Sequence, residues 1–548
     1  MQKTNSHEVF PSVKHVATNG RSSHDLSSRL YLNGEKKTVE DVLSVFAPLF
    51  EPFVPLVQGS PKHDGSQPGP GIRGPEHISL KIDRDGFSRD VHTHMDSSYR
   101  LKIGEHEIEI SAGGHSGMIY AFSSLLQLCA SEGGNGAGLP AMEISDSPVF
   151  SHRGLMLDVS RHFFNVSTVK KLLDLMVVLK MNVFHWHLSD DQGWRVESFT
   201  FPELNTISSR REKTASKSRP VGGYYTHDEI REVVRYAGMR GIEIIPEFDM
   251  PGHVSAILAA FPQLSCRGVH GPVPGDFGIF EDVACAGKDE VYGFFSTLLD
   301  EILPLFPGPR VHLGGDEVPK SRWKECPRCQ EKIRSEALKD EEDLQAFFMN
   351  SMIRVLNRHG KTCVAWNEAF YSPAMEDSAI MQFWREDGGA QLSNTALHGD
   401  RKVILSDFWH YYLDYPHGMT PFNKTWSYIP RIPNMKPEDA ERIIGIEAPL
   451  WTEYVPNEER LYAMILPRIF ALAETAWGRK SPEKFKNVLR RLERLELMLA
   501  RIGYSGTPVR KASPGGIRAF FQLFRFFVPI SWSRFLGTLK ELKREGRR

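Results

Sequence analysis

Val311-His-Leu-Gly-Gly-Asp-Glu-Val318 is a short apolar run that leads through two glycines into two adjacent carboxylates. Such runs are typical of strands buried on both faces of an α/β sheet, and glycines permit a sharp turn where a Cβ would clash. Neighbouring side chains on an extended strand point to opposite faces, so Asp316 and Glu317 share one site only after a turn. The stretch predicts a strand that delivers two acids to a pocket, with the acidic start of a helix as an equal alternative.

Eight strand-like segments, this one included, alternate with helical patterns between about residues 150 and 480. We expect strands at 155–159, 182–188, 242–247, 310–313, 362–366, 380–384, 402–405 and 445–451. Helix signals separate them, including a capping box at Thr226 and a helix from about Asp340 to Gly360. Eight strands separated by helices predict an α/β fold, a (β/α)8 TIM barrel, and a span of roughly 330 residues indicates long loops.

The barrel is predicted to span 149–480 and to have a part of different character on either side. Residues 1–148 contain a capping-box signal at Thr38, a hairpin pattern over 99–110 and a helix from Ser116, which predict a small non-catalytic α+β domain. Residues 481–548 are expected to form a helical extension. Its phenylalanine-rich stretch and basic end favour a helix packed on the barrel or on a dimer partner over a membrane-surface segment.

The composition is that of an ordinary globular protein. The 548 residues are 41% hydrophobic and 25% charged, with a formal net charge of −1. No polyelectrolyte character is present, so we expect no nucleic-acid partner. The start of the chain lacks a charged region followed by an apolar one, and no run reaches the roughly 18 apolar residues of a membrane span. We therefore expect a cytoplasmic protein without a membrane span, and a homodimer is compatible with the sequence.

Six cysteines are few for this length and favour thiols over a disulfide framework. Cys326-Pro-Arg-Cys329 has the spacing of a metal-binding knuckle, but a structural zinc site normally has four ligands and no second such pair is present. We therefore expect a surface loop here, with no metal. Cys266 and Cys285 flank a loop rich in glycine and proline and are able to pair only if the chain meets an oxidant.

The carboxyl ends of the expected strands carry polar and aromatic residues. They are 158–162, 189–191, 249–253, 316–317, 366–368, 384, 406–407 and 451–453. Such residues gathered at one end of a barrel indicate an active site, whereas structural ones would be scattered. One tryptophan at such a place is more often core packing, but three beside carboxylates suit the apolar face and the hydroxyls of a sugar. The pattern predicts a carbohydrate site.

Five blocks carry a resemblance to a known family. They are His152–His162, Trp186–Arg195, Pro246–His253, His312–Glu317 and Leu450–Glu453. In residues and order they resemble glycoside hydrolase family 20, the β-N-acetylhexosaminidases, over about residues 100–505. The resemblance implies an exo-acting hydrolase that removes terminal β-linked N-acetylglucosamine or N-acetylgalactosamine with retention. The expected partner is an oligosaccharide or glycoconjugate that contains N-acetylhexosamine, and we expect no cofactor.

The resemblance also implies catalytic roles. Glu317 resembles the general acid that protonates the leaving oxygen and then activates water. The nucleophile is the substrate's own 2-acetamido oxygen, Asp316 accepts the acetamido N–H, and Tyr412 donates to the acetamido oxygen. Two alternatives remain: a carbohydrate-binding barrel without hydrolysis, and a two-carboxylate glycosidase whose second acid is Glu368.

Further residues are implied to bind the sugar or to assist the acid. The family's aromatic walls around the acetamido methyl group and the sugar face are matched in this sequence by Trp366, Trp384 and Trp451. The residues implied to bind the outer hydroxyls are Arg153, Asp414 and Glu453. A relay that tunes Glu317 is implied for Asp191 and His253.

Overall fold

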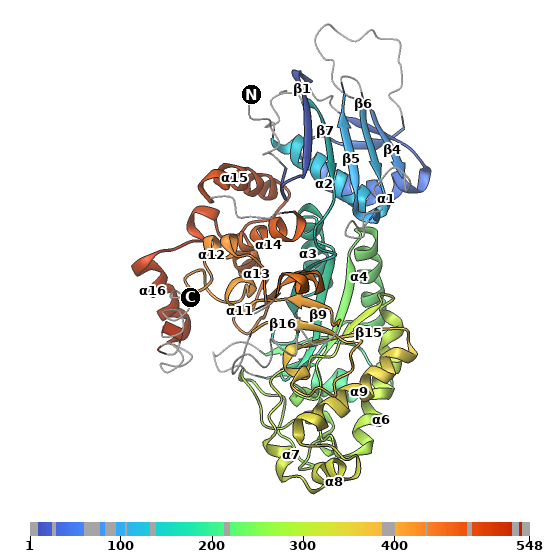
Figure 1. The fold of residues 1–548 in the computed structure, drawn as a ribbon, viewed down its shortest axis with the longest axis vertical. Helices are drawn as coiled ribbons and strands as arrows, with labels where there is room; N and C mark the ends of the chain where they lie inside the picture. The colour runs from blue at the N-terminus through green and yellow to red at the C-terminus, as the bar shows by residue number, and fades with distance from the viewer. Residues whose placement is uncertain are drawn as a thin grey trace.

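The computed structural model describes residues 9–24, 29–59, 77–82, 95–104, 107–131, 139–212, 220–385, 400–432, 436–478, 485–528, 536 and 538–539. Figure 1 shows a sheet near the N-terminus at one end of the molecule and a barrel below it. A group of helices that includes α6 (Asp289–Ile302) and α9 (Glu341–Arg358) lies at the opposite end.

The N-terminal part is a seven-stranded sheet with two long helices. In chain order its strands are β1 (His15–His24), β2 (Leu30–Asn33), β3 (Leu56–Gln58), β4 (His77–Ile82), β5 (Tyr99–Ile103), β6 (Glu107–Ala112) and β7 (Leu139–Asp146). Their order across the sheet is β1-β7-β5-β6-β4-β2-β3. Helix α2 (His115–Ser131) contacts α1 (Lys36–Phe50) and the sheet on one side and the barrel helix α3 (Val166–Val178) on the other.

The predicted small α+β domain is confirmed. Strands β5 and β6 form the expected antiparallel hairpin, and α2 begins one residue before the expected start. The capping box at Thr38 is wrong, because α1 begins at Lys36 after Glu35 and has no side-chain cap. Strands β1 to β4 were not anticipated, since their pairing partners lie far away in the sequence and their own alternation is short.

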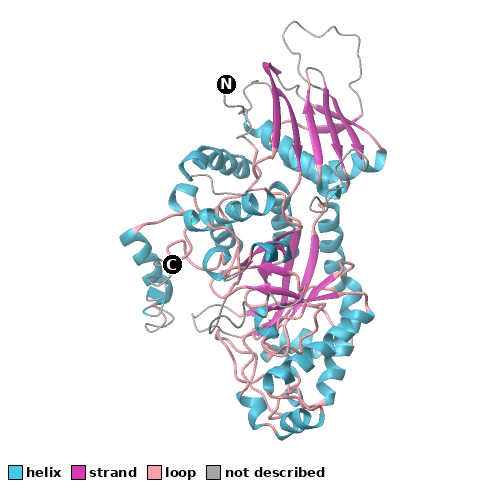
Figure 2. Ribbon diagram, viewed as in Figure 1, coloured by secondary structure: helices cyan, strands magenta, loops and turns pink. Residues whose placement is uncertain are grey.

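Eight parallel strands close into a barrel, which confirms the predicted TIM fold. They are β8 (His152–Asp158), β9 (Val183–Asp190), β13 (Glu243–Phe248), β14 (Arg310–His312), β15 (Thr362–Trp366), β16 (Ile380–Phe383), β17 (Val403–Leu405) and β18 (Ile443–Leu450). Each strand pairs with the next, and β18 pairs with β8 from Gly445 opposite His152 onward. Because all eight run the same way, their carboxyl ends meet at one end of the barrel, away from the N-terminal sheet (Figure 2).

Helices and short turns surround the barrel. The remaining helices up to residue 477 are α4 (His227–Met239), α5 (Ser255–Ala260), α7 (Ser321–Glu325), α8 (Pro327–Ser335), α11 (Phe408–Tyr411), α12 (Phe422–Ser427), α13 (Glu458–Ile465) and α14 (Arg468–Trp477). Short strands are β10 (Gly193–Trp194), β11 (Arg210–Arg211) and β12 (Val221–Gly222). Short 3-10 helices are η3 (Pro262–Leu264), η4 (Leu303–Leu305), η5 (Asn367–Phe370), η6 (Pro437–Arg442) and η7 (Val509–Lys511), and η2 (Leu204–Ser208) is a short π-helix. A further 3-10 helix, η1 (Met95–Ser97), belongs to the N-terminal part. The capping box at Thr226 is present, and Asp340 caps α9 as expected.

The C-terminal extension is helical in its described part, with α15 (Phe485–Arg501) and α16 (Gly516–Phe527). Leu523 and Phe527 pack on Met419, and the Phe526 ring lies 4.9 Å from that of Tyr454. The packing interpretation therefore holds for α16, while residues 529–535, 537 and 540–548 lie outside the described residues. No helix in the described part of the chain is both long and apolar enough to cross a membrane.

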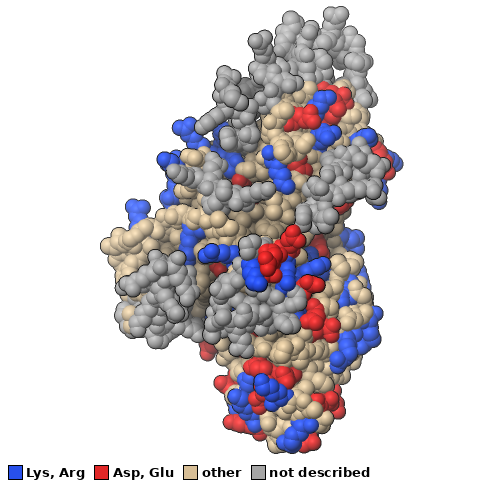
Figure 3. All heavy atoms as spheres, viewed as in Figure 1, with Lys and Arg blue, Asp and Glu red and all other residues tan. Residues whose placement is uncertain are grey.

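The expected surface loop around Cys326 and Cys329 is wrong. Cys326 precedes α8 and Cys329 lies in its first turn, and the two side chains are 6% and 0% exposed. Pro327 reads as a loop residue in the sequence, yet proline is also well suited to the first position of a helix because its missing N–H is not needed there. The outer face of this region carries basic and acidic side chains side by side at the lower end of Figure 3.

Candidate active site

The turn after β14 places the two predicted acids. Gly314 and Gly315 have φ values of 65° and 89°, and a Cβ on Gly314 would lie 1.8 Å from an oxygen of Asp249. Only glycine fits this left-handed, crowded turn. Asp316 and Glu317 follow directly, and the next helix begins only at Ser321, so the helix-start alternative is excluded.

Glu317 lies against a histidine at the carboxyl end of the barrel. His253 Nε2 is 3.7 Å from Glu317 Oε2 and 4.0 Å from Asp316 Oδ2, while its Nδ1 is 3.0 Å from Asp191 Oδ2. His253 and Glu317 have φ values of 51° and 48°. Positive φ in two non-glycine residues that face each other is strain of the kind found at functional sites. The predicted relay residues Asp191 and His253 are thus lined up behind Glu317.

Surrounding carboxylates favour a charged His253. Burial lowers the pKa of this imidazole, but the carboxylates of Asp190, Asp191 and Asp249 outweigh burial and raise it well above its ordinary value. The imidazole, whose charged form these carboxylates favour, faces Asp316 and Glu317, and it is held in orientation by Asp191.

Asp316 is a buried carboxyl that is poised to change its protonation state. Burial, together with the charges of Glu317 and Glu368 and against the opposing charge of His253, raises the pKa of Asp316 to about 7. Asp316 Oδ1 has no hydrogen-bond partner among the described residues. A buried acceptor without a partner is costly in the free protein and is suited to receive a donor from a ligand.

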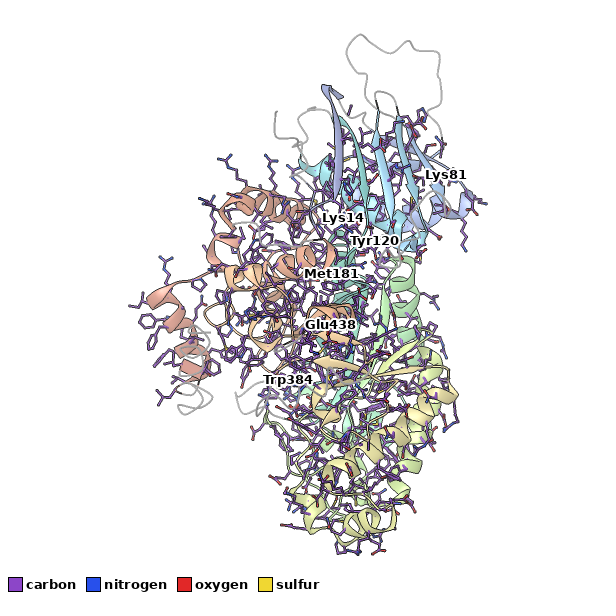
Figure 4. All side chains as sticks on the ribbon, in the orientation of Figure 1. Lys14, Lys81, Tyr120, Met181, Trp384 and Glu438 are labelled. Carbon is purple, nitrogen blue, oxygen red and sulfur yellow. The ribbon has the colours of Figure 1, made fainter. Side chains whose placement is uncertain are left out.

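An aromatic wall lies beside these acids. Trp366, Trp384 and Tyr412 form a buried cluster with Met156, and Trp451 packs against its edge. The rings of Trp384 and Tyr412 stack with centroids 5.7 Å apart, and those of Trp366 and Trp451 are 5.9 Å apart. Figure 4 places Trp384 well away from Tyr120, which lies next to the N-terminal sheet. The wall therefore belongs to the same barrel end as the acids.

The predicted polar residues Asp414 and Glu453 are close enough to influence each other. Burial raises the pKa of Asp414 well above its ordinary value, and the charge of Glu453 adds to this. Burial also raises the pKa of Glu453, against the opposing charge of Arg161. Asp414 Oδ1 has no hydrogen-bond partner in the described part of the chain. These two acids form a second polar group at the site, next to the aromatic wall.

The prediction for Arg153 is wrong. Its guanidinium donates to Phe150 O and Lys180 O at 2.8 Å and to the Tyr120 hydroxyl at 2.6 Å. Arg153 is the second residue of β8, so it lies at the amino end of the barrel and joins the barrel to α2. The other predicted site residues are gathered at the carboxyl end.

Two arginines at the site were missed. Arg161, three residues beyond β8, has Nη1 2.7 Å from Asp190 Oδ2 and its guanidinium 4.9 Å from the Trp451 ring centroid. Arg385 lies 4.1 Å from the Trp384 ring centroid, with Nη2 3.8 Å from Glu317 Oε1. The available signal was position, because Arg161 ends the polar cluster after the first barrel strand and Arg385 directly follows Trp384.

Two profiles of one family match consecutive parts of the chain. The profile of the glycosyl hydrolase family 20 catalytic domain matches residues 150–480, and that of domain 2 of the same family matches residues 6–147. The β-hexosaminidase of Porphyromonas gingivalis is 36% identical over 450 residues, which cover 78% of this chain and 56% of that protein. The β-hexosaminidase of Akkermansia muciniphila is 33% identical over 434 residues, which cover 76% of this chain and 86% of that protein.

A solved structure shares the fold over most of the chain. The exo β-N-acetylglucosaminidase of Vibrio harveyi, in complex with N-acetylglucosamine, superposes with a TM-score of 0.77 at 28% identity. The match covers 92% of this chain and 79% of that one, whereas this chain spans little more than half of the Porphyromonas relative. With a family profile over most of its length and two such relatives, the chain belongs to glycosyl hydrolase family 20.

Proposed function

We propose that this chain is an exo-acting β-N-acetylhexosaminidase that removes terminal β-linked N-acetylglucosamine or N-acetylgalactosamine with retention of configuration. The observation that carries the proposal is the adjacent pair Asp316 and Glu317, facing His253 and bordered by the aromatic wall. The names of the relatives agree with this activity, and that of the Vibrio harveyi protein agrees with exo action.

Glu317 is the proposed general acid and base. In the first step it gives its proton to the glycosidic oxygen as the bond from that oxygen to the anomeric carbon breaks. In the second step the Glu317 carboxylate takes a proton from the water that attacks the same carbon. His253 contacts Glu317 on one side and Asp191 on the other, so it is proposed to position the acid and to adjust its charge.

Asp316 and Tyr412 are proposed to act on the acetamido group. Its oxygen attacks the anomeric carbon and its nitrogen gains positive charge, which a carboxylate that accepts the N–H would stabilise. Asp316 has an oxygen without a partner for this N–H, and its charge acts on Tyr412, whose hydroxyl would donate to the acetamido oxygen. Attack by water then opens the cyclic intermediate from the opposite face, so two inversions give net retention.

The remaining site residues are proposed to bind the sugar ring. Trp366, Trp384 and Trp451 offer apolar faces to the acetamido methyl group and the ring. Asp414, Glu453 and Arg161 offer hydrogen-bonding groups to the outer hydroxyls.

The geometry of Glu368 argues against the two-carboxylate alternative. Its Oε2 accepts the backbone N–H of Glu317 at 2.6 Å, and Arg385 Nη2 lies 4.0 Å from its Oε1. A nucleophile needs an oxygen that is directed at the anomeric carbon, whereas this carboxylate supports the turn that carries Glu317. Glu368 is therefore better suited to hold the acid in place.

Comparison of two chromogenic substrates tests the proposal. We expect a p-nitrophenyl β-N-acetylglucosaminide to be hydrolysed and the matching β-glucoside, which lacks the internal nucleophile, to be slower by about 10³-fold or more. Equal rates on both substrates would favour a protein nucleophile. Binding of N-acetylglucosamine with no hydrolysis of either substrate would identify a carbohydrate-binding barrel.

A further inference from the structure

Four of the six cysteines meet at one place outside the candidate active site. The sulfurs of Cys266, Cys285, Cys326 and Cys329 all lie within 4.8 Å of one another. The Sγ atoms of Cys285 and Cys329 are 3.6 Å apart, and the pairs Cys266–Cys329 and Cys285–Cys326 are each 3.8 Å apart. All four are free thiols, and only Cys266 is not fully buried.

These separations are those of a tetrahedral thiolate site. A zinc ion binds sulfur at about 2.3 Å, so the edges of its tetrahedron of four sulfurs are about 3.8 Å long. A disulfide needs two sulfurs about 2.05 Å apart, and none of these three pairs is that close. Four sulfurs mutually within 4.8 Å enclose room for one ion but not for a cluster of several irons and sulfides.

The backbone around the thiols is built to bring them together. Cys326 and Cys329 present the two-residue spacing of a zinc knuckle at the start of α8, where free backbone N–H groups favour negative charge. Cys285 is followed by Gly287, whose Cβ would lie 2.3 Å from the Cys329 nitrogen if it were any other residue. Glycine at this position therefore lets the segment that carries Cys285 approach the backbone of Cys329 closely.

We propose that Cys266, Cys285, Cys326 and Cys329 bind one zinc ion in a closed structural site. Each thiol that becomes a ligand releases its proton to solvent, and no oxidation or reduction is involved. Four protein ligands leave no open position, so the ion has no part in hydrolysis.

The proposed ion would join the two loops that carry the catalytic acid and its histidine. Cys266 and Cys285 lie in the loop after β13, where the Ala284 N–H donates to Pro251 O at 3.0 Å, two residues before His253. Cys326 and Cys329 lie beyond Glu317 in the loop after β14, and Trp323 Nε1 donates to Ala284 O at 3.0 Å. Closing two long loops on each other lowers the entropy of the unfolded chain and fixes their relative position.

Metal and thiol analysis of the purified full-length chain tests this assignment without reference to activity. We expect about one zinc per chain and, after denaturation without reductant, six reactive thiols once the metal is chelated. X-ray absorption at the zinc edge should give four sulfurs at about 2.3 Å. One iron per chain in place of zinc would overturn the proposal. A chain with no metal and only two reactive thiols would also overturn it, because four of the cysteines would then be paired in two disulfides.

Matched serine variants localise the ion. Cys285→Ser and Cys326→Ser should reduce bound zinc at least about tenfold, whereas Cys363→Ser, at a buried cysteine outside the cluster, should retain the full amount. Zinc retained by both cluster variants would contradict the site. If a cluster variant does not fold, the metal content, thiol count and absorption spectrum of the unchanged protein still decide the question.

Discussion

Arg153 lies at the amino end of β8, and Arg161 lies just beyond the carboxyl end of the same strand. Both side chains are buried, but the groups that contact them differ. Arg153 donates to two backbone carbonyls and a tyrosine hydroxyl, and its guanidinium lies 5.2 and 5.3 Å from the ring centroids of Tyr120 and Trp477. Arg161 faces the carboxylates of Asp190 and Asp158, at 2.7 and 3.6 Å, and the face of Trp451.

The two arginines also differ in the charges around them. Burial lowers the pKa of Arg153, and no carboxylate is among the groups that oppose it. For Arg161 burial acts in the same direction, but Asp190 and Asp158 outweigh it and raise the pKa. Residues at the amino end of a TIM barrel support the fold, and those at the carboxyl end meet the substrate. The two residues are of the same type, so their position relative to the strand, and not the residue type, indicates which of them belongs to the active site.

The largest effect is expected at the centre of the carboxyl end. Glu317→Gln removes the proposed proton donor, so kcat should fall by about 10²- to 10⁴-fold on a substrate with a poor leaving group, with KM little changed. Steady-state kinetics on an alkyl N-acetylglucosaminide measures this. Glu325→Gln, at an exposed glutamate of α7, is the control and should match the unchanged enzyme. An unaltered kcat in Glu317→Gln would remove this residue from the mechanism.

A second effect, of about 10²- to 10³-fold in kcat, is expected for Asp316→Asn. Its carboxylate is proposed to stabilise charge that develops only during reaction, so the loss should appear in kcat rather than in KM. Exposed Asp377 gives the matched control Asp377→Asn. If KM alone rises, Asp316 binds the sugar but does not stabilise the intermediate.

The two arginines should then separate cleanly. Arg161→Met should lower kcat/KM by about 10- to 100-fold because the sugar loses a charged contact, and it should also lower the thermal midpoint because the buried carboxylates of Asp158 and Asp190 lose their partner. Arg153→Met should leave kcat/KM of the folded enzyme unchanged and destabilise the fold by roughly 2–4 kcal/mol, since buried carbonyls lose their donor. Kinetics and thermal unfolding of both variants measure the contrast. A loss of kcat/KM in Arg153→Met but not in Arg161→Met would mean that the sugar binds at Arg153.

The smallest effect concerns pH. Burial raises the pKa of Asp316 to about 7, so this carboxyl is protonated below that pH and cannot stabilise positive charge. The kcat/KM of the unchanged enzyme should therefore rise with pH up to about 7 and then level off or fall, up to tenfold per pH unit on the acid side. If kcat/KM of the Asp316→Asn variant falls toward acid pH in the same way, the fall is caused by another titrating group and not by Asp316.

The barrel could be predicted from the sequence because the local hydrophobic pattern of its strands matches their burial in the folded protein. Most barrel strands contain a buried apolar stretch, and Gly314 and Gly315 indicate the turn that carries the acids. The N-terminal strands β1 to β4 were missed, since their pairing depends on distant partners. The block His152–His162 holds two arginines, and the error at Arg153 arose because the one before the expected strand at 155–159 was assigned to the sugar in place of the one beyond it.

The cysteine cluster shows a different limit. Cys266 and Cys285 are separated by 19 positions and by at least 41 from the pair at 326 and 329, so no short motif joins them. Only the packing of the two loops brings the four sulfurs together. Long-range constellations of this kind require the fold before they can be recognised.

The central claim, that the nucleophile belongs to the substrate, is tested most directly by trapping. Intact-protein mass spectrometry is performed after incubation with an activated 2-fluoro glycoside, alongside inhibition by a thiazoline that mimics the bicyclic intermediate. We predict no covalent adduct and thiazoline binding tighter than that of N-acetylglucosamine, since the mimic resembles a high-energy state. A stable adduct on Glu368 or another carboxylate, with weak thiazoline inhibition, would contradict substrate assistance and assign the chemistry to two carboxylates.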